Sequence, residues 1–389
     1  MPRSLRTRFT NRATWVLQLA VALALGMSIG KWLGATYVPW PPVLLGLVFL
    51  LTIAVHEAGH WLGCRYAGLR CYAVAVLWLH LERGAAGWRC RVGPRRAGSL
   101  GHVRALPAGA SNLSRQMVCF VAGGPVASVG AGLLALALGG WLRQQFPGPS
   151  LLAGYFAAEA SWVFGVGSLA TGVLNAIPFT TRYGNVSDCE RLRRLRRPSP
   201  ETTRELALLR LSGHSHLGVR PRAWDAALVA QLLETPTQSA HYCAAQALAY
   251  TYQLDRADLA AARQHLAAAC AARQAATPAL RRQLCAEAAC LALLHDNQPE
   301  AATEWLHAAR AVKLSTKRPS ENDDFMLALA ACNARDWLAA WQHLQHCTQA
   351  LAKTPDAGAR AMGFDRLRQL QTLVEQRAAS AGKATLARA

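Results

Sequence analysis

The chain has 389 residues and a formal net charge of +20, and its basic residues are nearly all arginines. This length allows two or more domains. High positive charge is typical of nucleic-acid-binding proteins, but no motif of a known nucleic-acid reader accompanies it, so we expect no nucleic-acid partner. The arginines instead flank long apolar runs, which is the pattern of a membrane protein.

Four apolar segments in the first half of the chain are long enough to cross a bilayer, which takes about 20 apolar residues. They cover residues 15–33, 43–63, 117–142 and 151–178. The first follows a basic N-terminus but lacks a clear signal-peptide cleavage site, so we interpret it as an uncleaved anchor. The sequence therefore predicts a mainly α-helical polytopic protein with about four spans in the lipid bilayer.

Arginines are distributed unevenly among the segments that join these spans. They are frequent before the first span, in the loop 64–116 and after the last span. Residues 34–42 carry no charge, and residues 143–150 carry only Arg143. Because arginine-rich segments stay in the cytoplasm, we expect both termini and the long loop there, in a protein of the bacterial inner membrane.

The loop between the second and third spans is rich in β-forming residues. Residues 69–81 show a two-residue periodicity, with Val74, Val76 and Trp78 on one side. Residues 89–92 and 100–106 are candidates for further short strands. We therefore expect a small amphipathic sheet within 64–116, at the cytoplasmic face of the membrane.

From about residue 201 the pattern changes to Ala-rich helices of moderate length. Three stretches, 244–266, 286–308 and 327–344, each contain two helical segments that a short polar turn separates. They resemble tetratricopeptide-like hairpins, although their period is longer than 34 residues and not constant. A plain helical bundle is the alternative. We thus expect a membrane-embedded core at 1–200 and a soluble, cytoplasmic, repeat-like helical domain at 201–389.

The second span contains the sequence HEAGH near its cytoplasmic end, at residues 56–60. Residues four apart share one face of a helix, so His56 and His60 can bind one zinc ion while Glu57 acts on a water molecule there. The pattern also arises by chance, but an ionisable residue within a membrane span is costly and indicates function. Two core histidines beside a salt-bridged glutamate are the alternative.

A catalytic zinc site usually has three protein ligands and one open position. We predict Asp188 as the third ligand, because it lies where the chain returns to the cytoplasmic face after the fourth span. Asn175 and Pro178 precede it, and a proline can break the helix there. Glu159 is the rival, but it lies about 12 Å from the outer end of its span, whereas the histidines lie about 20–26 Å from theirs. We expect Glu159 to bond to neighbouring helices.

The order of these motifs resembles the site-2 protease family of intramembrane zinc metalloproteases. Such proteins carry HExxH in one span, a glycine–proline motif in the next, and Asn-x-x-Pro followed by Asp-Gly in the one after. The corresponding residues here are HEAGH at 56–60, GGPVAS at 123–128, and Asn175, Pro178 and Asp188. The resemblance covers roughly residues 40–195.

Three features depart from the family pattern. The spacing from Asn175 to Asp188 is longer, Cys189 replaces the glycine after the aspartate, and Ser128 stands where asparagine is common. The glycine–proline motif itself is kept. A glycine there allows another backbone to approach closely and a proline loosens the helix, although small residues are also ordinary at membrane helix interfaces.

The resemblance implies a zinc metalloendopeptidase that hydrolyses peptide bonds of transmembrane protein substrates, with one Zn²⁺ per chain. His56, His60 and Asp188 would bind the zinc, and Glu57 would be the general base. Supporting residues would be Gly124, Pro125, Asn175 and Pro178. The helical domain would bind a protein partner. The alternative function is a catalytically silent membrane scaffold that recruits partners through the same domain, against which the complete HExxH motif argues.

Overall fold

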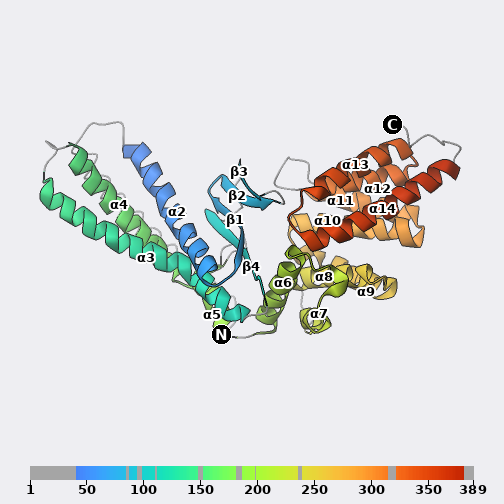
Figure 1. Ribbon diagram of the computed structural model, residues 1–389, viewed down its shortest axis with the longest axis horizontal. Helices are drawn as coiled ribbons and strands as arrows, with labels where there is room; N and C mark the ends of the chain where they lie inside the picture. Colours follow the sequence, from blue (N-terminus) through green and yellow to red (C-terminus); the bar gives the residue numbers. More distant parts are fainter. Residues whose placement is uncertain are drawn as a thin grey trace. The chain divides into compact units, whose positions relative to one another are not determined.

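The computed structural model describes residues 41–84, 87–93, 99–109, 112–147, 152–180, 186–197, 199–234, 239–313 and 321–380. The predicted first span, 15–33, lies outside these ranges. The described residues are mostly helical, with one small sheet (Figure 1). The chain divides into two compact units at about residue 198.

Three helices of unit 1 are long and apolar enough to cross a membrane. They are α2 (Pro41–Tyr66), α3 (Leu113–Gln145) and α4 (Leu152–Asn175), and they coincide with the second, third and fourth predicted spans. Helix α3 begins earlier than predicted because Asn112 caps it, with the side chain accepting a hydrogen bond from Arg115 N at 3.2 Å. Helix α4 ends before Pro178, since the residue preceding a proline disfavours helical dihedrals.

Glycines allow these three helices to pack closely against one another. Gly59 of α2 and Gly123 of α3 face each other, and a Cβ atom on either would overlap the carbonyl oxygen of the other. Gly132 and Gly172 make similar close approaches between α3 and α4. Lipid provides no hydrophobic force between helices, so such small residues add stability through van der Waals contact. The Gly59–Gly123 contact fixes α3 against the HEAGH turn of α2.

The predicted sheet is present in the loop after α2. Its strands are β1 (Arg70–Val76), β2 (Leu79–Gly84), β3 (Gly87–Val92) and β4 (Gly101–Leu106), in the order β3-β2-β1-β4. Strand β1 pairs antiparallel with both β2 and β4. The predicted β-rich segment 69–81 contains β1 and the start of β2, because the chain reverses at Leu77, whose φ is 53°. Trp78 therefore lies in a turn, and no Gly, Asn or Asp marks that turn.

Unit 2 is helical in its described residues from Ser199 onward. Its predicted helix–turn–helix stretches are the hairpins α8–α9, α10–α11 and α12–α13, and their turns contain Ala257, Asn297 and Arg335 in left-handed conformation. A short π-helix, η4 (Ala292–Asp296), ends α10. The elements are α6 (Pro200–His216), η2 (Pro221–Ala223), α7 (Ala226–Leu233), α8 (Ala240–Asp255), α9 (Leu259–Ala271), η3 (Arg273–Ala275), α10 (Pro278–Leu291), α11 (Pro299–Ala311), α12 (Glu321–Asn333), α13 (Trp337–Ala352) and α14 (Ala357–Ser380).

Helix α14 returns to the start of unit 2 and packs against α6 and η2. Arg220, which follows α6, donates hydrogen bonds to Asp365 of α14 and to Asp255 of α8, each at 2.5 Å. Deeper in the unit, Glu287 of α10 accepts hydrogen bonds from Tyr250 and Arg366, each at 3.0 Å. These charged contacts join helices that are far apart in sequence.

Candidate metal centre

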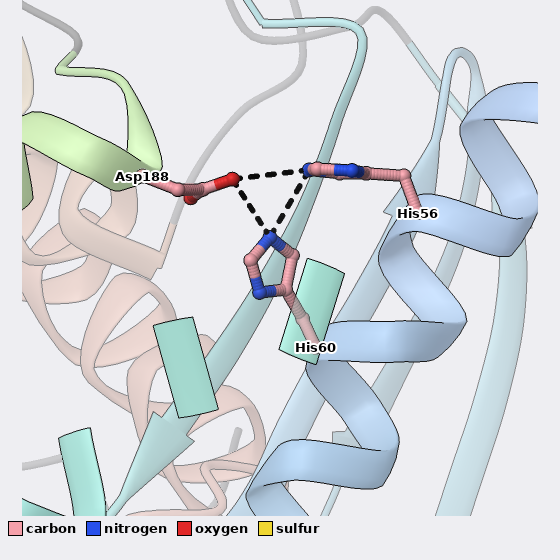
Figure 2. A group of neighbouring side chains, drawn as sticks. All are labelled: His56, His60 and Asp188. Atoms are coloured by element: carbon pink, nitrogen blue, oxygen red, sulfur yellow. Dashed lines mark hydrogen bonds and ion pairs between the residues drawn. The ribbon is translucent and has the colours of Figure 1, made fainter. Parts of the chain in front are cut away.

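Two helices of unit 1 bring the predicted ligands together. Helix α2 carries His56 and His60 near its C-terminal end, and Asp188 is the first residue of α5 (Asp188–Arg196). Figure 2 shows the three side chains pointing toward one another. Asp188 Oδ2 lies 3.2 Å from His56 Nε2 and 3.5 Å from His60 Nε2, and the two Nε2 atoms are 3.2 Å apart. All three side chains are largely buried.

Ser187 positions the aspartate. As the N-cap of α5, its Oγ accepts a hydrogen bond from Glu190 N at 3.2 Å. The same Oγ accepts from Phe179 N at 3.1 Å and donates to Ile177 O at 2.7 Å. Ser187 therefore ties the first turn of α5 to the segment that follows α4, which holds Asp188 facing α2.

Helix α3 orients both imidazoles through their Nδ1 atoms. His60 Nδ1 lies 3.0 Å from the carbonyl oxygen of Phe120, and His56 Nδ1 lies 3.0 Å from Ser128 Oγ. Because a carbonyl can only accept, His60 Nδ1 donates this hydrogen bond, and a neutral ring would then present the lone pair of Nε2 to the cluster. Such partners on the far nitrogen are usual for metal-binding histidines.

Gly124 makes room for the His60 ring. A Cβ atom at this position would overlap the imidazole, Nε2 included. The predicted close approach of two backbones occurs at Gly123, whereas the missing side chain of Gly124 accommodates the His60 ring. Helix α3 continues through Pro125, whose carbonyl oxygen faces Gly172 of α4.

The donor set fits a tetrahedral zinc ion. With ligand bonds of about 2.0–2.1 Å, donor atoms of such a site lie about 3.3–3.4 Å from one another. The three distances here are 3.2, 3.2 and 3.5 Å. Asp188 Oδ2 is buried and makes no hydrogen bond within the part of the chain that the structure describes. Converging acceptor atoms repel each other, and a shared cation satisfies them together.

Asp188 is an anion at neutral pH. Burial acts to raise the pKa of this carboxyl, but the neighbouring imidazoles of His56 and His60 outweigh burial and lower the pKa to about 2. Cys189, where the family has glycine, lies within α5 and is not in a left-handed conformation. The turn at this point therefore requires no glycine.

Glu57, the predicted general base, follows His56 on α2. Its side chain is buried, and its Oε2 has no hydrogen-bond partner among the described residues. The carboxyl lies against Gly101, where a Cβ atom would overlap it. Gly101, the first residue of β4, can therefore approach the HEAGH motif because it has no side chain.

The other residues considered from the sequence lie in different surroundings. Asn175 donates to Thr171 O at 3.0 Å within α4, and Pro178 lies in the segment that Ser187 holds. Glu159 accepts two hydrogen bonds from Arg143, both at 2.9 Å, and so joins α4 to α3. The prediction that Glu159 bonds to a neighbouring helix is confirmed.

Several residues that shape the centre were not predicted as part of it. Ser187 acts through capping, for which the Ser-x-x-Glu pattern of residues 187–190 is a sequence signal. Phe120 acts through a backbone carbonyl and Gly101 through a missing side chain, and neither has a sequence signal. Ser128 was noted only as a departure from the family pattern. Comparison of the chain with protein-family models, curated proteins and solved structures gives no match.

Proposed function

We propose that this chain is a zinc metalloendopeptidase of the site-2 protease type, which cleaves membrane-protein substrates. The observation that carries the proposal is the tetrahedral spacing of His56, His60 and Asp188 next to Glu57, whose Oε2 has no hydrogen-bond partner in the part of the chain that the structure describes. Three ligands leave one position open, which is the arrangement of catalytic rather than structural zinc. His56 and His60 also lie on α2, a helix apolar enough to span a bilayer.

His56, His60 and Asp188 would hold the ion. Zinc, when bound, polarises a carbonyl oxygen and makes water more acidic. Glu57 takes a proton from the attacking water and then donates it to the nitrogen of the departing amine. One water is consumed, the C–N bond breaks, and a carboxylate and an amine are released. Asp188 contributes negative charge, and Ser128 and the Phe120 carbonyl keep the two imidazoles oriented.

Strand β4 supports a role for the sheet in holding substrate. A transmembrane helix must unwind before its peptide bonds become accessible. Strand β4 is the last strand of the sheet, and within the described residues no strand pairs with its other edge. An extended segment added to this edge by backbone hydrogen bonds would pass Gly101 and hence the Glu57 carboxyl.

The proposal also covers the location of the protein in the membrane and the role of unit 2. The arginine distribution favours the bacterial inner membrane with both termini in the cytoplasm. The stacked hairpins of unit 2 resemble tetratricopeptide-like repeats, which commonly bind proteins. We assign to this unit the recruiting or gating of substrate, and it takes no part in breaking the peptide bond.

The decisive experiment separates zinc binding from proton transfer. The full chain is reconstituted in liposomes with fluorescently labelled single-span peptides that carry a helix-breaking Asn-Pro or Gly-Pro pair at several depths. We expect cleavage by the parent chain and a loss of at least about 100-fold in Glu57→Gln, the lower end of what a general base contributes. Zinc content by atomic emission stays unchanged, because Glu57 is not a ligand.

Glu159→Gln is the matched control, since it makes the same change at a carboxylate on another span. It should keep both activity and zinc. Cleavage by Glu57→Gln at the parent rate would disprove the assigned base. Stoichiometric zinc in a parent chain that cleaves none of the peptides would favour a silent scaffold.

A further inference from the structure

A second group of potential metal ligands lies in unit 2, on the hairpin α12–α13. Asp324 is on α12, and His343 and His346 are on α13. Asp324 Oδ1 lies 3.3 Å from His343 Nδ1 and 3.8 Å from His346 Nδ1. One donor atom from each residue lies within 4.8 Å of the other two.

Helix geometry explains why the two histidines converge. Residues three apart on a helix are neighbours on its surface, and their rings are 6.2 Å apart in an edge-to-face arrangement. Helix α13 begins only a few residues after α12 ends, and the two helices pack together. The facing carboxylate therefore comes from an adjacent helix and not from a flexible loop.

The ligand chemistry suits a divalent transition metal. Two imidazole nitrogens and one carboxylate oxygen are a common set for zinc. The two distances from Asp324, 3.3 and 3.8 Å, are near the donor spacing of about 3.3–3.4 Å in a tetrahedral site. The side chains are 32%, 29% and 60% exposed for Asp324, His343 and His346, so water can occupy the remaining coordination positions.

We propose that Asp324, His343 and His346 form a second site, which binds Zn²⁺ or a similar divalent transition metal and links α12 to α13. Asp324 also ends a stretch, 321–324, with three acidic residues in four positions of a chain whose net charge is +20. A metal that binds the folded hairpin but not the unfolded chain stabilises the folded state by mass action. Unit 2 would therefore be more stable when zinc is present.

The test uses a full chain that lacks the first centre. His56→Ala/His60→Ala protein is purified in detergent, stripped with a chelator and titrated with Zn²⁺ by calorimetry. We expect one equivalent to bind and the thermal midpoint of unfolding to rise. Adding His346→Ala should weaken binding at least 10-fold, and adding Asp324→Asn should weaken it while preserving the shape of the site. Because His346 is largely exposed, its removal should not prevent folding.

His307→Ala is the matched control, because this histidine of α11 is exposed and belongs to neither cluster. It should bind zinc as the background chain does. If the background chain takes up no more zinc than its His346→Ala derivative, the inference is wrong, and the three residues form only ion pairs. If His56→Ala/His60→Ala does not fold, the parent chain is titrated instead. The expected stoichiometry is then two, falling to one with His346→Ala.

Discussion

The two units of this protein each contain two histidines and an aspartate at similar spacing, but the surroundings of the two clusters differ. In unit 1, His56 and His60 have hydrogen-bond partners on α3, and Asp188 is held by the capped start of α5. In unit 2, Asp324 faces His343 and His346 from the adjacent helix, and all three side chains are partly exposed. Similar ligand sets can thus have very different support.

We propose that this difference in support separates a catalytic site from a stabilising one. Catalysis requires ligands fixed in place and a base beside them. The unit 1 cluster has both, since Glu57 is buried beside it and its Oε2 has no hydrogen-bond partner among the described residues. The unit 2 cluster joins neighbouring helices of one hairpin and exposes its ligands to water. We therefore assign hydrolysis to unit 1 and stabilisation to unit 2.

The largest expected effect is the loss of the buried carboxylate. Asp188→Ala should weaken zinc binding in unit 1 by more than the roughly 100-fold that loss of a supporting partner costs, because it removes an anionic ligand itself. Asp324→Ala should cost less in unit 2, since water can replace an exposed oxygen. Each is measured by chelator competition in a chain without the other cluster's histidines.

Glu159→Ala is the control for this comparison. Glu159 pairs with Arg143 and not with the histidines, so zinc affinity should stay at the parent value. A larger loss for Glu159→Ala than for Asp188→Ala would reverse the ligand assignment. Equal losses for Asp188→Ala and Asp324→Ala would contradict the role given to burial.

Much of the fold could be predicted because its signals are local. Long apolar runs predicted α2, α3 and α4, and polar turns predicted the hairpins of unit 2. The turn at Leu77 had no such signal: its left-handed conformation divides the predicted β-rich segment 69–81 between two strands. The return of α14 to α6 was also unpredictable, because it depends on contacts such as Arg220 with Asp365.

The next prediction has a smaller expected effect. It concerns Gly124→Ala, a substitution that adds one carbon atom beside the site. In Gly124→Ala the new methyl group would overlap the His60 ring, and overpacking of this kind costs about 1–3 kcal/mol. We expect zinc affinity in unit 1 to fall by up to about 100-fold, measured by the same competition. Gly130→Ala on the same helix is the control, since a Cβ there meets nothing within 4 Å. Equal affinities would show that the ring moves aside freely.

The candidate site divides into a predictable and an unpredictable part for a physical reason. HEAGH predicted two ligands because helix periodicity places His56 and His60 on one face. Asp188 was identified from its depth and from the family resemblance. The partners of the imidazoles are a serine and a backbone carbonyl on another helix, so only the contact between α2 and α3 identifies them.

The smallest expected effect concerns that supporting serine. Ser128→Ala removes the hydroxyl beside His56 Nδ1 and leaves every ligand in place. Loss of such a partner typically costs 10–100-fold in metal affinity, and a neutral hydroxyl polarises the ring less than a carboxylate does, so we expect about 10-fold. Ser168→Ala is the control: Ser168 is equally buried and donates to Ser128 O at 2.9 Å, without touching an imidazole.

For both serine variants, zinc affinity is compared with the thermal stability of the zinc-free chain. A general packing defect lowers both quantities, whereas a loss of ring orientation lowers mainly the zinc affinity. Ser128→Ala should lower zinc affinity more than Ser168→Ala, while the two zinc-free midpoints fall by similar amounts. If both variants lose affinity and stability in parallel, Ser128 acts only through packing of α3 against α4. The higher zinc affinity expected of the unit 1 cluster would then come from burial and from the capped position of Asp188, and not from the orientation of His56.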